Sequence, residues 1–268
     1  MNAVAFDLDD TLLHDDLTIS DFTVRVLRTL RQKGFRIIAA SGRSQFSMKP
    51  HIERLGCVSA YISCNGAEIW DGRTHALLRR ELFSTELSLE IARFAEEKDC
   101  YAQVYDGPSF FFNKHCHWAE LYASVSKLTG IYVGKLSEYI HEPRNKVLLI
   151  DAQERIASLY EEALSRFEGR ASVTCSKPIY LEFNPLRATK GIALGVACGL
   201  LDTDLKETVA FGDSLNDLSM LEAAGMGIAV SNGWKVIFPS CDEICGTNND
   251  DGPACWLNTH FLNGEVTA

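Results

Sequence analysis

The stretch Val4-Ala5-Phe6-Asp7-Leu8-Asp9-Asp10-Thr11 decides the fold, because an apolar run ends there in closely spaced carboxylates. On an extended strand, Asp7 and Asp9 would project to the same side. Open α/β sheets carry their active sites at the carboxyl ends of their strands. Two like charges this close repel each other unless a cation lies between them, and a divalent metal ion is the usual one. Asp-x-Asp pairs also occur in solvated turns and helix caps, so other motifs in the chain have to show whether this pair belongs to an active site.

The composition is that of an acidic, folded protein. The chain has 268 residues, of which 46% are hydrophobic, and a formal net charge of -10. This length is enough for one large domain or two modest ones, and the acidity argues against a nucleic-acid partner. No apolar run approaches ~20 residues, so no membrane span is expected. Without a secretory signal or a lipidation motif, we expect a cytoplasmic protein.

The nine cysteines are scattered and include no Cys-x-x-Cys pair. In a chain without a secretory signal, this pattern predicts reduced and mostly buried thiols. Cys241, Cys245 and Cys255, or the run His115-Cys116-His117, could be imagined as zinc ligands. Neither set has the spacing of a zinc finger or ribbon, so we do not predict structural zinc.

The two ends of the chain alternate between strands and helices. Such βαβ alternation predicts a Rossmann-like, doubly wound parallel sheet covered on both faces. The middle part mixes hairpins with helices and predicts an inserted α+β module, so the fold class is α/β. At the ends we expect strands at 3–7, 35–40, 58–62, 208–211 and 227–230, and helices at 20–33, 45–55, 190–201 and 214–224.

Two further motifs could hold an anion. Ser41-Gly42-Arg43 follows the strand at 35–40, where a hydroxyl and backbone N–H groups can meet a phosphate oxygen. Taken alone, the motif is better interpreted as an ordinary strand-to-helix turn with a serine cap. Lys190 begins a predicted helix, where a positive charge opposes the helix dipole. A residue that is misplaced for stability is a candidate site residue, although most such lysines are solvated surface groups.

The last motif is Phe211-Gly212-Asp213-Ser214-Leu215-Asn216-Asp217, where another apolar strand runs into carboxylates. Glycine permits a tight turn, and serine or asparagine can cap the helix that follows. Asp213 and Asp217 would lie about one helical turn apart and converge on one place.

Taken in order, these four motifs resemble those of the haloacid dehalogenase superfamily, and the long insertion before Lys190 resembles its Cof-type branch with a subclass IIB cap. Ser63-Cys64-Asn65-Gly66-Ala67 and Asn248-x-x-Asp251-Gly252 also resemble this branch. Asp10 departs from the pattern, since many relatives have glycine there, and Ser41 replaces the commoner threonine. The resemblance implies a catalytic core formed by 1–82 and 185–268, with 83–184 as the cap.

The resemblance implies a Mg²⁺-dependent phosphatase in which Asp7 forms an aspartyl-phosphate and Asp9 transfers protons. It also implies that positively charged and polar groups hold the phosphoryl oxygens. The metal is expected at Asp7, Asp9 (through its backbone carbonyl), Asp213 and Asp217. Asp217 would either coordinate the metal directly or orient the residues that coordinate it. Substrate contacts are expected from Ser41, Gly42, Arg43, Asn65, Lys190 and Asn216, with Ser41 and Lys190 also catalytic.

The expected partner is a small phosphorylated metabolite, such as a sugar phosphate or a phosphorylated cofactor. A phosphosugar mutase and a non-catalytic phosphometabolite-binding regulator remain alternatives, and the sequence does not decide between monomer and dimer. The cap is expected to choose the substrate. A minority of its aromatic and histidine side chains should contact it, drawn from Tyr101, Tyr105, Phe110, Phe111, Phe112, His115, His117 and Trp118.

Overall fold

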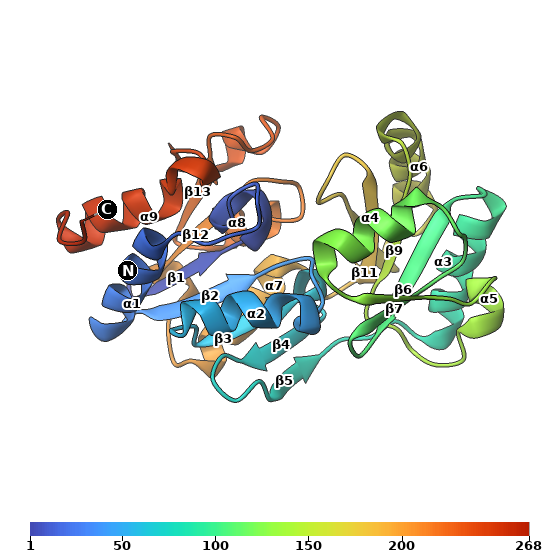
Figure 1. Cartoon of the computed structure of the whole chain (residues 1–268), viewed down its shortest axis with the longest axis horizontal. Helices are drawn as coiled ribbons and strands as arrows, with labels where there is room; N and C mark the ends of the chain where they lie inside the picture. Colours follow the sequence, from blue (N-terminus) through green and yellow to red (C-terminus); the bar gives the residue numbers. More distant parts are fainter. Residues whose placement is uncertain (268) are drawn as a thin grey trace.

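The computed structural model of the chain describes residues 1–267 and contains two β-sheets with helices packed on them. In Figure 1 the eight-stranded sheet occupies one half of an elongated molecule and the six-stranded sheet occupies the other. Both chain ends lie in the half with the larger sheet. The chain therefore leaves this half, builds the smaller sheet and returns. We call the two halves the core and the cap.

The core sheet is mostly parallel. Its strands are β1 (Ala3–Phe6), β2 (Arg36–Ala40), β3 (Ala60–Ser63), β4 (Glu68–Asp71), β5 (Leu77–Arg80), β12 (Thr208–Gly212), β13 (Met226–Val230) and β14 (Glu243–Cys245). They follow the order β14-β13-β12-β1-β2-β3-β4-β5. The six strands from β14 to β3 are parallel, and β4 and β5 add an antiparallel edge. Strand β1 thus lies in the middle, between strands from distant parts of the chain.

Helices cover both faces of the core sheet. On one face lie α1 (Asp21–Gln32), α2 (Gln45–Leu55) and α9 (Gly252–Leu262). On the other face lie α7 (Lys190–Leu200) and α8 (Leu218–Ala223). This is the doubly wound arrangement that the alternation of strands and helices predicts, and it confirms the α/β fold class.

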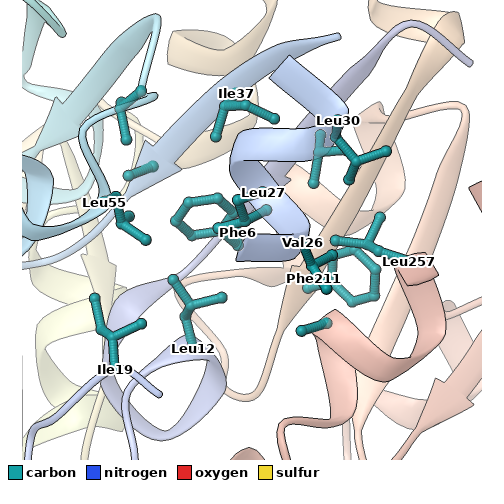
Figure 2. Packing of buried hydrophobic residues seen from close by; sticks show 14 of the residues in the cluster. Phe6, Leu12, Ile19, Val26, Leu27, Leu30, Ile37, Leu55, Phe211 and Leu257 are labelled. Carbon is teal, nitrogen blue, oxygen red and sulfur yellow. The ribbon is translucent and has the colours of Figure 1, made fainter. Parts of the chain in front are cut away.

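Successive side chains of the central strands point to opposite faces of the sheet, and helices cover apolar side chains on both faces. Val4 and Phe6 belong to the apolar cluster beneath α1, α2 and α9, whereas Ala5 belongs to the cluster beneath α7 and α8. Figure 2 shows the first cluster, with Phe6 beside Leu27 of α1 and Phe211 beside Leu257 of α9. Each side chain of this size contributes about 1.5–3 kcal/mol when it is fully buried. The buried strands are therefore apolar on both sides, and polar residues appear only where they end.

The cap sheet is mostly antiparallel. Its strands are β6 (Tyr101–Asp106), β7 (Ser109–Phe112), β8 (Thr129–Tyr132), β9 (Val147–Ile150), β10 (Ala171–Thr174) and β11 (Tyr180–Pro185). They follow the order β10-β11-β9-β6-β7-β8, in which only β7 and β8 are parallel. The cap helices are α3 (Thr85–Glu97), α4 (His117–Ser126), α5 (Leu136–Tyr139) and α6 (Gln153–Arg166).

The cap helices divide unequally between the faces of this sheet. Residues of α3, α5 and α6 join one apolar cluster, and residues of α4 join the cluster on the opposite face. The α4 face also carries Lys146, Leu148, Tyr180 and Glu182, which turn toward the core and line a cavity there. One face of the cap sheet is thus buried by its own helices, and the other helps to enclose a site.

One expectation about local structure was wrong, and two strands were missed. The sequence predicts a helix from residue 214, but α8 begins only at Leu218 because the preceding residues form a turn that the side chain of Asp217 stabilises. Strands β8 and β14 were not predicted; β8 is exposed along its whole length and so has no apolar alternation to reveal it. Among residues 1–267, no helix combines the length and apolarity needed to cross a bilayer.

Candidate active site

The predicted site residues meet where β1, β2 and β12 end. The register of the parallel sheet pairs Phe6 of β1 with Phe211 of β12, and β2 lies on the other side of β1. Asp7, Ser41 and Asp213 follow these strands and line one cavity between the core and the cap. The carboxyl edge of a parallel sheet thus gathers residues that are far apart in the sequence.

Lys190 places its ammonium group between two buried carboxylates. Its Nζ lies 2.5 Å from Oδ1 of Asp7 and 2.5 Å from Oδ1 of Asp217. Burial alone would lower the pKa of Lys190, but the two carboxylates raise it above its ordinary value, so the lysine is protonated. Lys190 is the first residue of α7, as predicted, and these carboxylates offset its unfavourable position at a helix N-terminus.

Both carboxylate oxygens of Asp217 are engaged. Oδ1 accepts from Lys190, and Oδ2 accepts from the backbone N–H groups of Asp213 at 3.0 Å and Ser214 at 3.1 Å. Gly212 makes this tight turn possible, since a Cβ there would lie 2.5 Å from the Cβ of Asp217. Asp217 therefore organises the turn after β12 and anchors Lys190.

Asp213 completes a cluster of three buried acids. Its Oδ1 accepts a hydrogen bond from Oγ1 of Thr11 at 3.0 Å. Burial raises the pKa of Asp213, and the nearby charges of Asp217 and Asp7 raise it further. Burial also raises the pKa of Asp7, against the opposing effect of Lys190. Asp7, Asp213 and Asp217 each offer an oxygen within 4.8 Å of the other two, and three carboxylates against one lysine form an oxygen-rich site that suits a divalent cation.

Asp9 is bound to Arg43 instead of to this cluster. Arg43 donates from Nε to Oδ2 at 2.7 Å and from Nη2 to Oδ1 at 2.6 Å, which is a bidentate pair. Burial alone would raise the pKa of Asp9, but Arg43 lowers it below its ordinary value. Arg43 also donates to Oγ of Ser47 and to the carbonyl of Val125 in α4, so it joins the core to the cap.

A chain of hydrogen bonds crosses from the core to the cap through two predicted asparagines. Oγ of Ser214 donates to Oδ1 of Asn216 at 2.7 Å, and Nδ2 of Asn216 donates to Oδ1 of Asn65 at 3.0 Å. Nδ2 of Asn65 donates in turn to Oε2 of Glu182 in β11 at 3.1 Å. Two motifs of the core are thus tied to one acid of the cap.

The turn that carries Asn65 has an unusual backbone. Cys64, Asn65 and Gly66 all have positive φ angles, of 50°, 57° and 111°. Glycine is required at the third position, because a Cβ on Gly66 would lie 2.4 Å from the carbonyl oxygen of Thr189. Thr189 caps the N-terminus of α7, so this turn packs against the start of the helix that carries Lys190.

The Ser41-Gly42 turn meets a second buried lysine. Lys146 forms an ion pair with Glu182, and both side chains are only 2% exposed. Nζ of Lys146 also donates to the carbonyl oxygen of Gly42 at 2.9 Å. Oγ of Ser41, on the cavity wall, accepts from the backbone N–H of Arg43 at 3.2 Å.

A cap lysine reaches the core beside Asp9. Nζ of Lys177 lies 3.2 Å from Oδ2 of Asp10. Burial alone would lower the pKa of Lys177, but Asp10 and Asp9 raise it, so the side chain is protonated. Asp10 has a φ of 58°, in the region that favours glycine, which accounts for the glycine expected in many relatives. The aspartate in this chain instead supplies a partner for the cap.

The model of the haloacid dehalogenase-like hydrolase family matches residues 4–257. This chain belongs to that family. It is 30% identical to the 5-amino-6-(5-phospho-D-ribitylamino)uracil phosphatase YcsE of Bacillus subtilis, over 94% of this chain and 92% of the relative. It is 24% identical to the pyridoxal phosphate phosphatase YbhA of Escherichia coli, over 97% and 98%. It shares its fold with the solved subclass IIB sugar phosphatase BT4131, at a TM-score of 0.86 and 20% identity, over 98% and 99% of the two chains.

The structure of this hydrolase brings all the predicted site residues into one region. Most of them line the cavity, whereas Asn65, Lys190 and Asp217 do not line it and reach its wall through hydrogen bonds. The predicted residues on the wall are Asp7, Asp9, Ser41, Gly42, Arg43, Asp213 and Asn216.

The cap side of the site was missed. None of the aromatic and histidine side chains that we expected to include substrate contacts lines the cavity. The sequence did contain a sign of Lys146 and Glu182, because Lys146 directly precedes an apolar strand and Glu182 lies between apolar residues within another. Such a residue on a buried strand needs a partner, and a buried ion pair supplies it. The cap residues on the wall are Tyr122, Val125, Ser126, Lys146, Leu148, Ser176, Lys177, Tyr180 and Glu182.

Proposed function

We propose that this hydrolase is a Mg²⁺-dependent phosphatase that acts on small phosphorylated metabolites through an aspartyl-phosphate intermediate. The observation that carries the proposal is the arrangement around Lys190, which holds Asp7 at the cavity wall next to the buried acid Asp213. A nucleophilic carboxylate, a fixed positive charge and a set of oxygen ligands are what phosphoryl transfer requires.

Asp7 is the nucleophile in this proposal. Lys190 holds its Oδ1, so Oδ2 is the oxygen that attacks phosphorus. A bond forms between Oδ2 and phosphorus, and the bond from phosphorus to the leaving oxygen breaks. Water then attacks the phosphorus of the aspartyl-phosphate, which releases phosphate and regenerates the Asp7 carboxylate.

Asp7 and Asp213 would hold Mg²⁺, together with the backbone carbonyl of Asp9, as the family resemblance implies. The bound ion would neutralise charge on the transferring phosphoryl group. We assign Asp217 to positioning, because Lys190 and two backbone N–H groups already occupy its oxygens. The buried carboxylates fit this assignment, since their ionised forms need more positive charge than Lys190 supplies.

Asp9 transfers the protons. As a carboxylic acid it protonates the leaving oxygen, and as a carboxylate it then takes a proton from the attacking water. Arg43 stabilises the carboxylate form, which is the form needed in the second step. The first step needs protonated Asp9, so the bidentate pair with Arg43 has to loosen before the leaving group departs.

The remaining wall residues suit a phosphorylated metabolite. Ser41, on the wall, would hold a phosphoryl oxygen, and the charge of Lys190, next to Asp7, would attract the phosphoryl group, as hydroxyl and charged donors do in other phosphoryl-transfer sites. Lys177, Tyr122 and Tyr180 lie on the cap side, where the leaving group would project. Two relatives are named as phosphatases of ribitylaminouracil phosphate and of pyridoxal phosphate, and we propose substrates of similar size and polarity.

The test is phosphate release from phosphorylated sugars, nucleotides, pyridoxal phosphate, flavin mononucleotide and ribitylaminouracil phosphate in the presence of Mg²⁺. Asp7→Asn should abolish turnover and leave the fold intact, whereas the exposed control Asp202→Asn should keep full activity. Near-normal turnover by Asp7→Asn would refute the assignment of the nucleophile. Conversion of a phosphosugar to its isomer, without free phosphate, would establish a mutase instead.

A further inference from the structure

The turn that follows β13, residues 231–234, contacts two segments of the active site without lining its cavity. We call it the β13 turn. Strand β13 lies beside β12 in the sheet, and the backbone N–H of Trp234 donates to the carbonyl oxygen of Asp213 at 2.7 Å. Nδ2 of Asn232 donates to the carbonyl oxygen of Asp10, also at 2.7 Å. The β13 turn thus joins the segment after β1 to the segment after β12.

Gly233 lies between these two contacts and packs directly on the backbone of Asp213. A Cβ at Gly233 would lie 2.8 Å from the carbonyl oxygen of Asp213 and 2.9 Å from that of Val230. Both are backbone atoms, so they cannot rotate away as the end of a side chain could. Glycine is the residue that permits such a close approach between two backbones. The β13 turn can therefore lie this close to Asp213 only with glycine at position 233.

Asn232 is exposed, and a second asparagine fixes its side chain. Oδ1 of Asn232 accepts from the backbone N–H of Asn248 at 3.0 Å, which directs Nδ2 toward Asp10. Asn248 itself is only 2% exposed and donates from Nδ2 to the carbonyl oxygen of Leu13 at 2.9 Å. It is the first residue of the motif Asn248-x-x-Asp251-Gly252, to which the phosphatase reaction assigns no role. These bonds tie the motif to the segment that follows the nucleophile.

The two segments that the β13 turn joins carry acids that repel each other. Asp7 and Asp213 each offer an oxygen within 4.8 Å of the other, and like charges oppose this approach when no cation lies between them. The φ of 58° at Asp10 also persists only where neighbours hold it. Thr11 links the segments by bonding an oxygen of the Asp213 carboxylate. Asn232 acts on a backbone carbonyl instead and leaves the carboxylate oxygens available to a cation.

We propose that the β13 turn holds the carboxylates of Asp7 and Asp213 at the separation that a divalent cation needs. Asn232 and Gly233 are positioning residues in this role, and Asn248 keeps Asn232 oriented. The inference rests on the proposed function, because it concerns the cation that the phosphatase would use. It assigns part of the metal affinity to residues that contact neither the cation nor the substrate. Ligands held in place beforehand bind more tightly because less freedom is lost on binding.

The test measures the binding of Mn²⁺ to the full chain by electron paramagnetic resonance, since Mn²⁺ takes the same oxygen ligands as Mg²⁺. Asn232→Ala removes the hydrogen bonds of that side chain, and Gly233→Ala adds a Cβ that forces the backbone to move. Ser231→Ala shortens an exposed neighbour in the same turn and is one control. Gly199→Ala, in α7, adds a Cβ that would have no neighbour within 4 Å and is the other. Urea denaturation without metal checks that each variant is folded.

We expect one tight Mn²⁺ site per chain, with the same affinity in the parent and in both controls. Asn232→Ala should weaken Mn²⁺ binding about threefold to tenfold, as the loss of one hydrogen bond can, and Gly233→Ala should weaken it further. The Mg²⁺ concentration that half-activates phosphate release should rise in the same order. At saturating Mg²⁺ the KM for substrate should change by less than about twofold, because neither residue lines the cavity.

The inference is overturned if folded Asn232→Ala binds Mn²⁺ as tightly as the parent, or if Ser231→Ala loses as much affinity. Should Gly233→Ala fail to fold, Asn232→Ala decides alone. A parent chain that binds Mn²⁺ but releases phosphate from no substrate would refute the phosphatase, while the variants would still decide the role of the β13 turn. A parent chain that binds no Mn²⁺ would overturn both the metal assignment and this inference.

Discussion

The core and the cap each contain a lysine buried between oxygen partners, and the two lysines differ in where those partners lie. Lys190 contacts Asp7 and Asp217, which both belong to the core. Lys146 contacts Glu182 in the cap and the carbonyl of Gly42 in the core. The first site is complete within one half of the molecule, whereas the second has its ion pair in the cap and gains its core contact only when the two halves are packed together.

This difference distinguishes residues that serve the reaction from residues that hold the core and the cap together. The core arrangement depends on strand register and on turns such as the one at Gly212, so it is built with the sheet itself. The contacts of Lys146, Lys177 and Arg43 instead span the interface between the halves. We therefore expect changes around Lys190 to affect the reaction, and changes around Lys146 to affect stability and the closure of the cap.

The largest expected effect comes from removing the metal, which acts only on the core. Because three buried carboxylates share one lysine, the phosphatase reaction should depend on an added cation. EDTA should abolish phosphate release, and excess Mg²⁺ should restore it. Phosphate release that survives chelation and dialysis would contradict the metal assignment. Unfolding curves with and without EDTA would show whether the loss is one of chemistry or of folding.

Lys190→Met tests the core lysine directly. The change removes the positive charge beside Asp7 and should lower kcat by roughly a thousandfold, comparable to the loss of a donor that stabilises transition-state charge. Steady-state kinetics measures the effect, and Lys49→Met, a half-exposed lysine of α2, is the control. A loss of less than tenfold would mean that the charge of Lys190 acts on structure alone.

Lys146→Met tests the lysine that spans the interface. The change leaves the Glu182 carboxylate buried without its partner, which typically costs about 3–5 kcal/mol of stability. The midpoint of urea denaturation should fall, and adding Glu182→Gln should recover part of the loss by removing the stranded charge. Lys135→Met, an exposed cap lysine, is the control. An unchanged midpoint in the single variant would show that the interface tolerates an unpaired acid.

Asp10→Gly gives the smallest expected effect. The pair between Asp10 and Lys177 is partly exposed, so its loss should cost at most about 1 kcal/mol. We expect KM to rise roughly twofold to fivefold, with kcat nearly unchanged, because the cap closes less firmly. Lys177→Met should match this effect if Lys177 only pairs with Asp10. A much larger effect of Lys177→Met would show that Lys177 also contacts the substrate.

Much of the core could be predicted because its signals are local. An apolar run that ends in Asp7 and Asp9, or in Asp213, marks the end of a buried strand, and parallel packing brings such ends together. The delayed start of α8 at Leu218 was not predictable from periodicity. It depends on the Asp217 side chain replacing helical hydrogen bonds with bonds to the backbone of Asp213 and Ser214.

The sequence by itself determined the α/β fold, the membership in a hydrolase family and the group of residues around Asp7. Only the tertiary structure decided which cap residues face that group, and it selected Lys146, Lys177 and Glu182 over the aromatic residues that we expected. The physical reason is that strand ends in one parallel sheet have a fixed relation, whereas the docking of two halves depends on contacts between residues far apart in the chain.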